Sequence, residues 1–302
     1  MRRDRGTRRG LGAVTGAAIL LGTTGTAAAL GPESLGAEVA AAWRAVIGGV
    51  VLVALAAAVG QPVWRYPASW PWAALGAVGV AVNQLGFFAA VDRAGVATGT
   101  LVTVGAVPVA AGVIDAATGR RPHVTWAAGV AGALGGVALL TGWNDDPAWG
   151  GVGLAAVAGV AAAGFGFAAQ RLMSDRPALP AMATVVAGGG VLLLPIALGG
   201  VGVAFGSWPA ATTVGYLGVF TMAGAYALWG AGLGRLPLAL VAAVTLAEPA
   251  VAALLAALVL DEPVTAASLV GTALVLVGVA ITTVGAASVE REGEPRRTVA
   301  DP

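Results

Sequence analysis

Ten apolar segments, each long enough to cross a lipid bilayer, recur along the 302 residues of this chain and constrain its fold more than any other feature. A spanning helix needs about 20 apolar residues. Because 58% of the residues are hydrophobic and only 10% are charged, a soluble domain of this length could not bury so many such segments. We therefore predict an all-α membrane protein with ten transmembrane helices. The predicted spans are 10–30, 38–59, 71–91, 96–117, 125–142, 150–170, 179–199, 209–232, 237–260 and 265–286.

Arginine is distributed unequally between the two sides of these spans. One side holds Arg2, Arg3, Arg5, Arg8, Arg9, Arg65, Arg120, Arg121, Arg171, Arg176, Arg235, Arg291, Arg296 and Arg297. The other side holds Arg93 and collects the acids Glu33, Asp92, Asp145, Asp146, Asp261 and Glu262. Because arginine-rich loops stay in the cytoplasm, we expect both termini to be cytoplasmic and the chain to lie in a bacterial inner membrane.

The third to fifth spans repeat as the eighth to tenth. When the two sets are superimposed, Thr103 falls on Thr245, Gly129 on Gly271, and Gly136 on Gly278, and these glycines permit close helix contact. Five is an odd number of spans, so we predict two inverted repeats, residues 1–142 and 143–288, followed by a cytoplasmic tail of residues 289–302. Inverted repeats are typical of transporters, which hold substrate near the membrane midplane and expose it alternately to each side.

The basic, then apolar amino terminus resembles a secretory or twin-arginine signal peptide. Removing residues 1–30 would leave nine helices and destroy the repeat, so we predict that this segment is kept as the first span.

Residues 226–281 carry the strongest resemblance to a known family. They contain an aromatic-rich helix, the Leu236-Pro237 turn, Glu248-Pro249 within the ninth span, an acidic-Pro loop and a Gly-spaced tenth span. With Gly22-Thr23-Thr24, Arg44 and Pro108 in the first half, the chain resembles the ten-helix EamA-like branch of the drug/metabolite transporter superfamily. The resemblance implies this fold and a transport activity, without naming a substrate. Two features depart from the family pattern: the first span lacks a tryptophan beside Gly22-Thr23-Thr24, and Arg120-Arg121 replaces a loop acid.

Charged residues within the membrane need a partner or a water-filled cavity. Glu248 lies roughly 17 Å along an axis that must cross about 30 Å. Glu248 has either a structural role, in which it pairs with backbone groups freed by Pro249 or with an arginine, or a functional role in substrate or proton binding. Arg44 is shallower and is expected to meet an internal partner, such as Glu248, or a substrate carboxylate rather than to snorkel. For Asp115 we expect a solvated ion pair with Arg120.

Two equivalent pairs of residues are the main pocket candidates. Gln84 and Phe87 fall on Tyr226 and Trp229, and each pair has the i, i+3 spacing that places both side chains on one helix face. We expect these four to line an amphipathic pocket, although ordinary helix packing would use the same spacing. The weaker candidates are Asn83, Thr103 and Thr245.

The prolines and tryptophans of the chain predict where helices bend and where spans end. Helix bends are expected at Pro108 and at Pro249, which removes an N–H and frees the carbonyl of residue 245. An aromatic belt is expected at the span ends. Its members are Trp64, Trp70, Trp72, Trp143, Trp149 and Trp208.

These features favour a carrier of a small amphipathic or zwitterionic metabolite, with export of amino acids or related compounds suggested by the family resemblance. Drug efflux or lipid-carrier flipping is the alternative, and sugar-phosphate transport is disfavoured because only Arg44 is positive within the membrane. Without cysteine, and with the single His123 in a loop, no enzyme activity, metal or other cofactor is expected, and no nucleic acid partner. Small four-helix relatives in the superfamily use a glutamate of the first helix to exchange protons with substrate, and the first and sixth spans here lack a central acid. The resemblance therefore implies facilitated diffusion, with proton coupling through Glu248 as the alternative.

Overall fold

The computed structural model describes residues 2–66, 69–120, 122–142, 148–261 and 263–292 of the chain. In these residues, ten helical segments are long and apolar enough to cross a membrane, which confirms the predicted all-α fold. The predicted ends agree with the observed ends within a few residues. These segments are Arg5–Ala29, Ala37–Ala58, Trp70–Gly95, Thr98–Ala117, Val124–Thr141, Trp149–Leu172, Ala178–Gly199, Trp208–Leu233, Leu238–Val259 and Ala266–Val284.

Several of the spans are divided into shorter elements. The helices are α1 (Arg2–Ala29), α2 (Ala37–Ala58), α3 (Trp70–Ala117), α4 (Val124–Thr141), α5 (Trp149–Leu172), α6 (Ala178–Gly199), α7 (Val201–Phe205), α8 (Trp208–Tyr216), α9 (Ala225–Leu233), α10 (Leu238–Thr245), α11 (Glu248–Val259) and α12 (Ala266–Glu292). Three further elements are the short 3₁₀-helices η1 (Glu33–Leu35) and η2 (Val63–Arg65) and the π-helix η3 (Leu217–Gly224).

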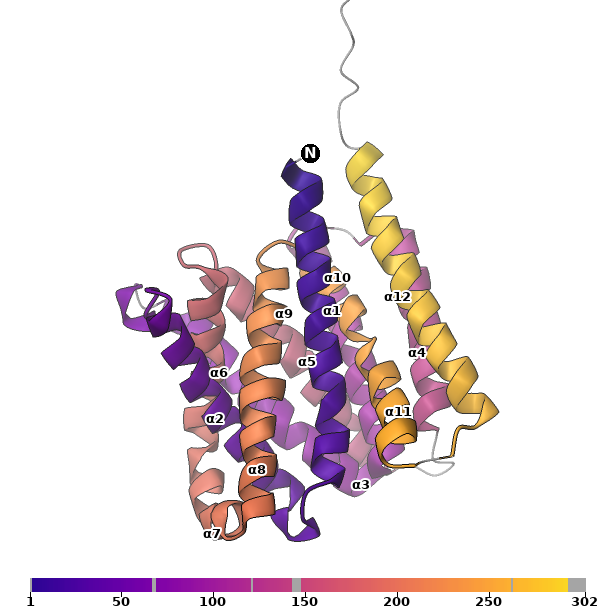
Figure 1. The fold of residues 1–302 in the computed structure, drawn as a ribbon. Coiled ribbons are helices and arrows are strands. Elements are labelled where there is room, and N and C mark those ends of the chain that lie inside the picture. The colour runs from indigo at the N-terminus through magenta and orange to yellow at the C-terminus, as the bar shows by residue number, and fades with distance from the viewer. Residues whose placement is uncertain (1, 67–68, 121, 143–147, 262, 293–302) are drawn as a thin grey trace, which may run out of the picture.

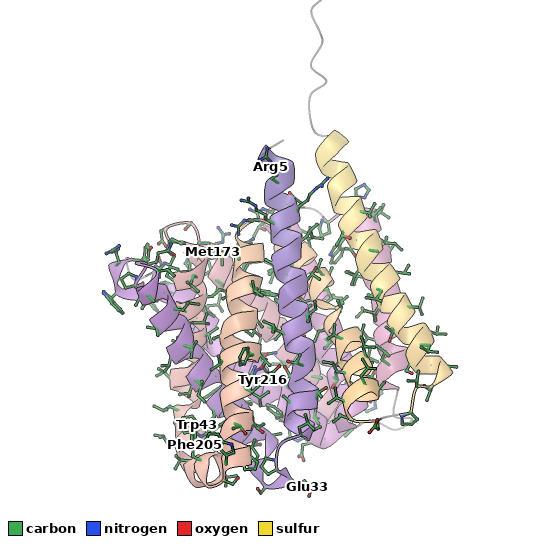
Figure 2. The ribbon with its side chains drawn as sticks, viewed as in Figure 1. Arg5, Glu33, Trp43, Met173, Phe205 and Tyr216 are labelled. Carbon is green, nitrogen blue, oxygen red and sulfur yellow. The ribbon has the colours of Figure 1, made fainter. Side chains whose placement is uncertain are left out.

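The two ends of the described chain lie on the same side of the molecule. Figure 1 shows that α1 begins and α12 ends at the top, while α1 runs downwards and α12 runs upwards. We call this the N-terminal face and the other the opposite face. In Figure 2, Arg5 and Met173 lie toward the N-terminal face, and Glu33 and Phe205 lie toward the opposite face. An even number of spans requires this arrangement.

The third and fourth spans meet at a single residue rather than in a loop. Gly95 alone leaves helical geometry within α3, with φ of 81° and ψ of 160°. A positive φ is strained for residues with a Cβ and is readily adopted by glycine. The third span therefore ends at Gly95 rather than at the predicted residue 91, and its connection to the fourth span is shorter than predicted. The helix continues through Pro108, so the bend expected at Pro108 stays a prediction.

Four repeat-related glycines join α4 to α12 at one edge of the molecule (Figure 1). A Cβ on Gly129 would lie 2.5 Å from the carbonyl oxygen of Gly278, and a Cβ on Gly136 would lie 2.5 Å from that of Gly271. Gly129 thus contacts Gly278, which is the repeat equivalent of Gly136, and Gly136 contacts Gly271, which is the repeat equivalent of Gly129. Two copies related by a two-fold axis make paired contacts of this kind. The close contact predicted for these glycines is confirmed, and α4 and α12 pack antiparallel, as inverted repeats require.

The ends of the spans carry exposed tryptophans, as expected for an aromatic belt. Trp64, Trp70, Trp149 and Trp208 are 73 to 80% exposed. Trp72 differs because its ring packs edge to face against Phe167, 5.6 Å between centroids. Trp143 lies outside the described residues, as do Arg121, Asp145, Asp146 and Glu262.

Candidate substrate-binding cavity

A cavity of about 400 Å³ lies in the middle of the bundle, between the two halves of the chain. Its wall is formed by α1, α2, α3 and α5 together with η3, α9, α10 and α11. All nine pocket and intramembrane-charge residues singled out from the sequence line this one cavity. They are Arg44, Asn83, Gln84, Phe87, Thr103, Tyr226, Trp229, Thr245 and Glu248. Pro108 and Pro249 are outside the lining.

The ninth span is broken beside the cavity. Helix α10 ends at Thr245 and α11 begins at Glu248, and the residues between them make the shorter i to i−3 hydrogen bonds, from Leu246 N to Ala243 O and from Ala247 N to Val244 O. Pro249 occupies the second position of α11, where a backbone N–H would have no partner within the helix, so its absence costs no hydrogen bond. The bend predicted here takes the form of a break. Glu248 thus sits in the first turn of a helix, whose N-terminus favours negative charge.

Arg44 reaches the cavity from α2 and is held by backbone rather than by an acid. Its Nη2 donates a hydrogen bond to the carbonyl oxygen of Thr221 at 3.2 Å, and its buried Nε has no hydrogen-bond partner. Thr221 lies in the π-helix η3, a type of distortion that is frequent at functional sites. The guanidinium therefore keeps its charge and spare donors beside the cavity.

Arg44 and Glu248 line the same cavity and interact electrostatically without a direct salt bridge. Within the described ranges, no nitrogen of Arg44 lies within 4.0 Å of an oxygen of Glu248. The direct pairing considered from the sequence is thus not formed. A guanidinium and a carboxyl group that line one cavity without a salt bridge between them are each available to a group of the ligand.

Three aromatic rings form the floor of the cavity. Phe165 lies 5.7 Å from Tyr226 and 5.9 Å from Trp229 between ring centroids, and Tyr226 lies 6.2 Å from Trp229. The indole Nε1 of Trp229 donates to Thr245 Oγ1 at 3.1 Å, which joins the aromatic floor to the broken helix. Gly166 makes room for this ring, since a Cβ there would lie 2.7 Å from Trp229 Cη2.

Phe165 was not among the residues proposed from the sequence. It is 4% exposed and belongs to α5. The size of Phe165 could have indicated it as a pocket candidate, because Phe165 is one of two aromatic residues in the interior of a span otherwise rich in Ala and Gly. Phe88, Thr24 and Thr100 also line the cavity and were missed.

Only some of the polar side chains that the first half contributes to the cavity have hydrogen-bond partners. Asn83 Nδ2 donates to the carbonyl oxygen of Ala158 at 3.0 Å, and Gln84 Nε2 donates to Asn83 Oδ1 at 3.3 Å. The hydroxyl groups of Thr24 and Thr103 are buried at the cavity wall without a hydrogen-bond partner among the described atoms. Buried polar groups normally have partners, so these two oxygens are available to a ligand or water.

The cavity extends toward the opposite face and is closed toward the N-terminal face. At one end its lining includes the exposed residues Gly25, Ala28 and Ala37. At the other end it stops at Trp229 and Ala242, which are 6% and 2% exposed.

Asp115 lies on the closed side and differs from the expectation. It is 1% exposed, and its Oδ2 accepts a hydrogen bond from the backbone N–H of Ala239 at 2.8 Å. The solvated ion pair expected with Arg120 was therefore wrong. The physical reason is at the start of α10, where Pro237 at the N-cap provides no capping side chain and leaves backbone donors to be satisfied from elsewhere.

Comparisons with known proteins agree with this architecture. The model of the EamA-like transporter family matches the chain twice, over residues 8–142 and 149–284. The uncharacterized transporter YwfM of Bacillus subtilis (strain 168) is 32% identical over 266 residues, covering 86% of this chain and 88% of that protein. A crystal structure of a protein with 23% sequence identity has the same fold, with a TM-score of 0.78 over 95% of this chain and 99% of the other.

Proposed function

Since this chain belongs to the EamA-like transporter family, we propose that it carries a small amphipathic zwitterion, such as an amino acid with an apolar side chain, and exports it by alternating access. The observation that supports this substrate class most directly is the presence of Arg44 and Glu248 in the wall of one cavity without a salt bridge between them. In the proposed complex, the guanidinium of Arg44 binds the substrate carboxylate and the carboxylate of Glu248 binds the ammonium group.

The size and wall of the cavity support a ligand of this kind. A volume of about 400 Å³ lies at the lower end of the range for small-molecule sites. The rings of Phe165, Tyr226 and Trp229 offer an apolar surface for a side chain. The unpartnered hydroxyl of Thr24 is a further donor for the carboxylate. A drug or a lipid carrier would use the same aromatic surface and leave one of the two charges without a partner, which favours the zwitterion.

We propose that the protein lies in the inner membrane with its N-terminal face in the cytoplasm. The described loops of the N-terminal face carry Arg65, Arg120, Arg171 and Arg235, and the opposite face carries Glu33 and Asp92. In this orientation the cavity of the present structure faces outward, the state from which an exporter releases its substrate.

Uptake into proteoliposomes from a mixed pool tests this substrate class. The pool contains the twenty amino acids, their amine and acid analogues, and a set of amphipathic drugs, and mass spectrometry measures what enters. We expect enrichment of apolar amino acids over empty liposomes, and a weaker enrichment in Glu248→Gln, which keeps the cavity and loses one charge. Enrichment of drugs or of singly charged analogues, with no amino acid among them, would refute the proposal.

A further inference from the structure

A second hollow lies on the N-terminal face, directly behind the closed end of the substrate cavity. Its volume is about 610 Å³, and its wall includes Arg120, Gln170, Arg171 and Arg235. The turn between α9 and α10, residues 234–237, separates it from the cavity together with the buried side chains of Leu233 and Leu236. A substrate that passes between the two hollows has to displace this turn.

Two side chains of the first half of the chain form hydrogen bonds to the backbone of Ala239, at the beginning of α10. Asp115 Oδ2, at the end of α3, accepts from Ala239 N at 2.8 Å. Trp126 Nε1, near the start of α4, donates to Ala239 O at 2.9 Å. Both backbone groups of Ala239 are therefore bound from the other half of the molecule. These bonds join segments that alternating access requires to move apart.

The acceptor role of Asp115 follows from the local sequence of α10. The N-cap residue Pro237 has no side-chain oxygen, so the helix cannot cap itself. Asp115 provides the acceptor instead, and a buried carboxylate is favoured at this end because the first N–H groups of a helix carry partial positive charge. Other charged groups near this point are Arg120, which interacts electrostatically with Asp115, and the more distant Arg235 of the same hollow.

Helix α10 connects this contact to the substrate cavity. It is eight residues long, with Ala239 at its beginning and Thr245 at its end, and Thr245 accepts the indole N–H of Trp229 in the cavity floor. The i to i−4 hydrogen bonds of α10 connect its two ends. A displacement of Ala239 would thus reach Thr245 in the cavity wall.

We propose that Asp115 and Trp126 form a gate that holds the N-terminal face closed by binding the backbone of Ala239, and that Asp115 is a positioning residue for the transport cycle. This N-terminal gate (Asp115, Trp126 and Ala239) opens when the α9–α10 turn leaves α3 and α4. The proposal concerns the conformational state and holds for any substrate of the cavity.

Cysteine accessibility tests the gate directly, because the chain has no native cysteine. Ala242→Cys places one thiol at the closed end of the cavity. In oriented membrane vesicles, an impermeant maleimide is applied from one face at a time, and mass spectrometry gives the labelling rates. The parent variant is expected to react faster from the opposite face. Adding Asp115→Ala is expected to raise the rate from the N-terminal face about tenfold, and Trp126→Phe about threefold to fivefold, as fits the loss of a charged and a neutral hydrogen bond.

Two variants separate the gate from a general loss of stability. Asp115→Asn keeps a carbonyl acceptor for Ala239 N and is expected to label like the parent. Asp92→Ala removes an exposed acid of α3 on the opposite face and is expected to change neither rate. If Asp115→Ala does not accumulate, Trp126→Phe decides the question. An unchanged ratio of the two rates in Asp115→Ala, or in Trp126→Phe where Asp115→Ala does not accumulate, would overturn the proposal, as would an equal rise from both faces.

Discussion

The guanidinium of Arg44 donates a hydrogen bond to the carbonyl oxygen of Thr221 at 3.2 Å, and this contact links α2 of the first half to the π-helix of the second. A carbonyl partner orients the arginine without neutralising it. Its charge therefore remains available at the wall of the cavity that also contains Glu248. Recognition of a substrate carboxylate at this cavity depends on that availability.

The aromatic floor is expected to contribute to substrate affinity. Tyr226→Ala removes one ring of the Phe165 cluster and should weaken transport by about threefold to tenfold, because aromatic contacts are worth about 0.5 to 1.5 kcal/mol beyond burial. Trp229→Phe keeps a ring and loses the bond to Thr245 Oγ1, so a loss of about fivefold is expected. The matched control is Trp208→Ala, since Trp208 is 80% exposed at a span end. Equal transport by all three, at matched expression, would mean that the rings serve packing alone.

The glycine contact between α4 and α12 is expected to limit stability. Gly129→Ala or Gly278→Ala places a methyl group 2.5 Å from a backbone oxygen of the partner helix, where no side chain can move aside. We expect a loss of about 1 to 3 kcal/mol in unfolding free energy, as for other overpacked sites. Gly135→Ala on the same helix is the control, because a Cβ there meets no atom within 4 Å. Thermal unfolding in detergent compares the three, and equal melting temperatures would contradict the close packing.

Single cysteines can test the orientation of the chain in the membrane. Ser174 lies in the connection between α5 and α6 on the N-terminal face, and Glu33 lies in η1 toward the opposite face (Figure 2); both are exposed. With the N-terminal face in the cytoplasm, an impermeant thiol reagent should label Glu33→Cys in intact cells, and Ser174→Cys only after permeabilisation. The reverse pattern would show that the chain is inserted the other way up.

The energy source is expected to be the metabolite gradient alone. Glu248 lies within the ninth span and lines the cavity, and in the proposed complex it binds an ammonium group rather than a proton. An imposed pH gradient should therefore leave the plateau of substrate uptake into proteoliposomes unchanged, in the wild type and in Glu248→Gln. Accumulation above equilibrium that requires the gradient and is lost in Glu248→Gln would instead identify Glu248 as a proton-coupling site.

The sequence predicts the spans well because membrane thickness fixes the length of each apolar run. It also identifies residues that line one cavity, for a physical reason. Gln84 and Phe87 in one repeat, and Tyr226 and Trp229 in the other, occupy equivalent positions on a single helix face. A pseudo-two-fold axis places such equivalent faces opposite each other, and the structure puts all four at one cavity.

Other features have no comparable signal in the sequence. Asp115 binds a backbone N–H that is 124 residues away, and a backbone donor leaves no trace in residue identity. The π-helix depends on how η3 packs against α1 and α2, since Leu217–Gly224 is ordinary apolar sequence. Gly95 was not recognised as a turn because one glycine among the 47 of this chain carries little information by itself.

The central claim is that the cavity recognises both charges of a zwitterion, and competition in counterflow measures this most directly. Proteoliposomes loaded with phenylalanine take up labelled phenylalanine in the presence of unlabelled phenylalanine, phenethylamine, which lacks the carboxylate, or 3-phenylpropionate, which lacks the amine. Arg65→Gln, which changes an exposed arginine bonded to Gly60 O, is the control variant.

For the wild type and Arg65→Gln, we predict that each singly charged analogue competes at least about tenfold more weakly than phenylalanine, because a hydrogen-bonded charge contributes about 1.5 to 3 kcal/mol. Arg44→Gln should lose the preference for phenylalanine over phenethylamine, and Glu248→Gln the preference over 3-phenylpropionate. Equal competition by all three compounds against the wild type, or preferences that survive both substitutions, would contradict the account.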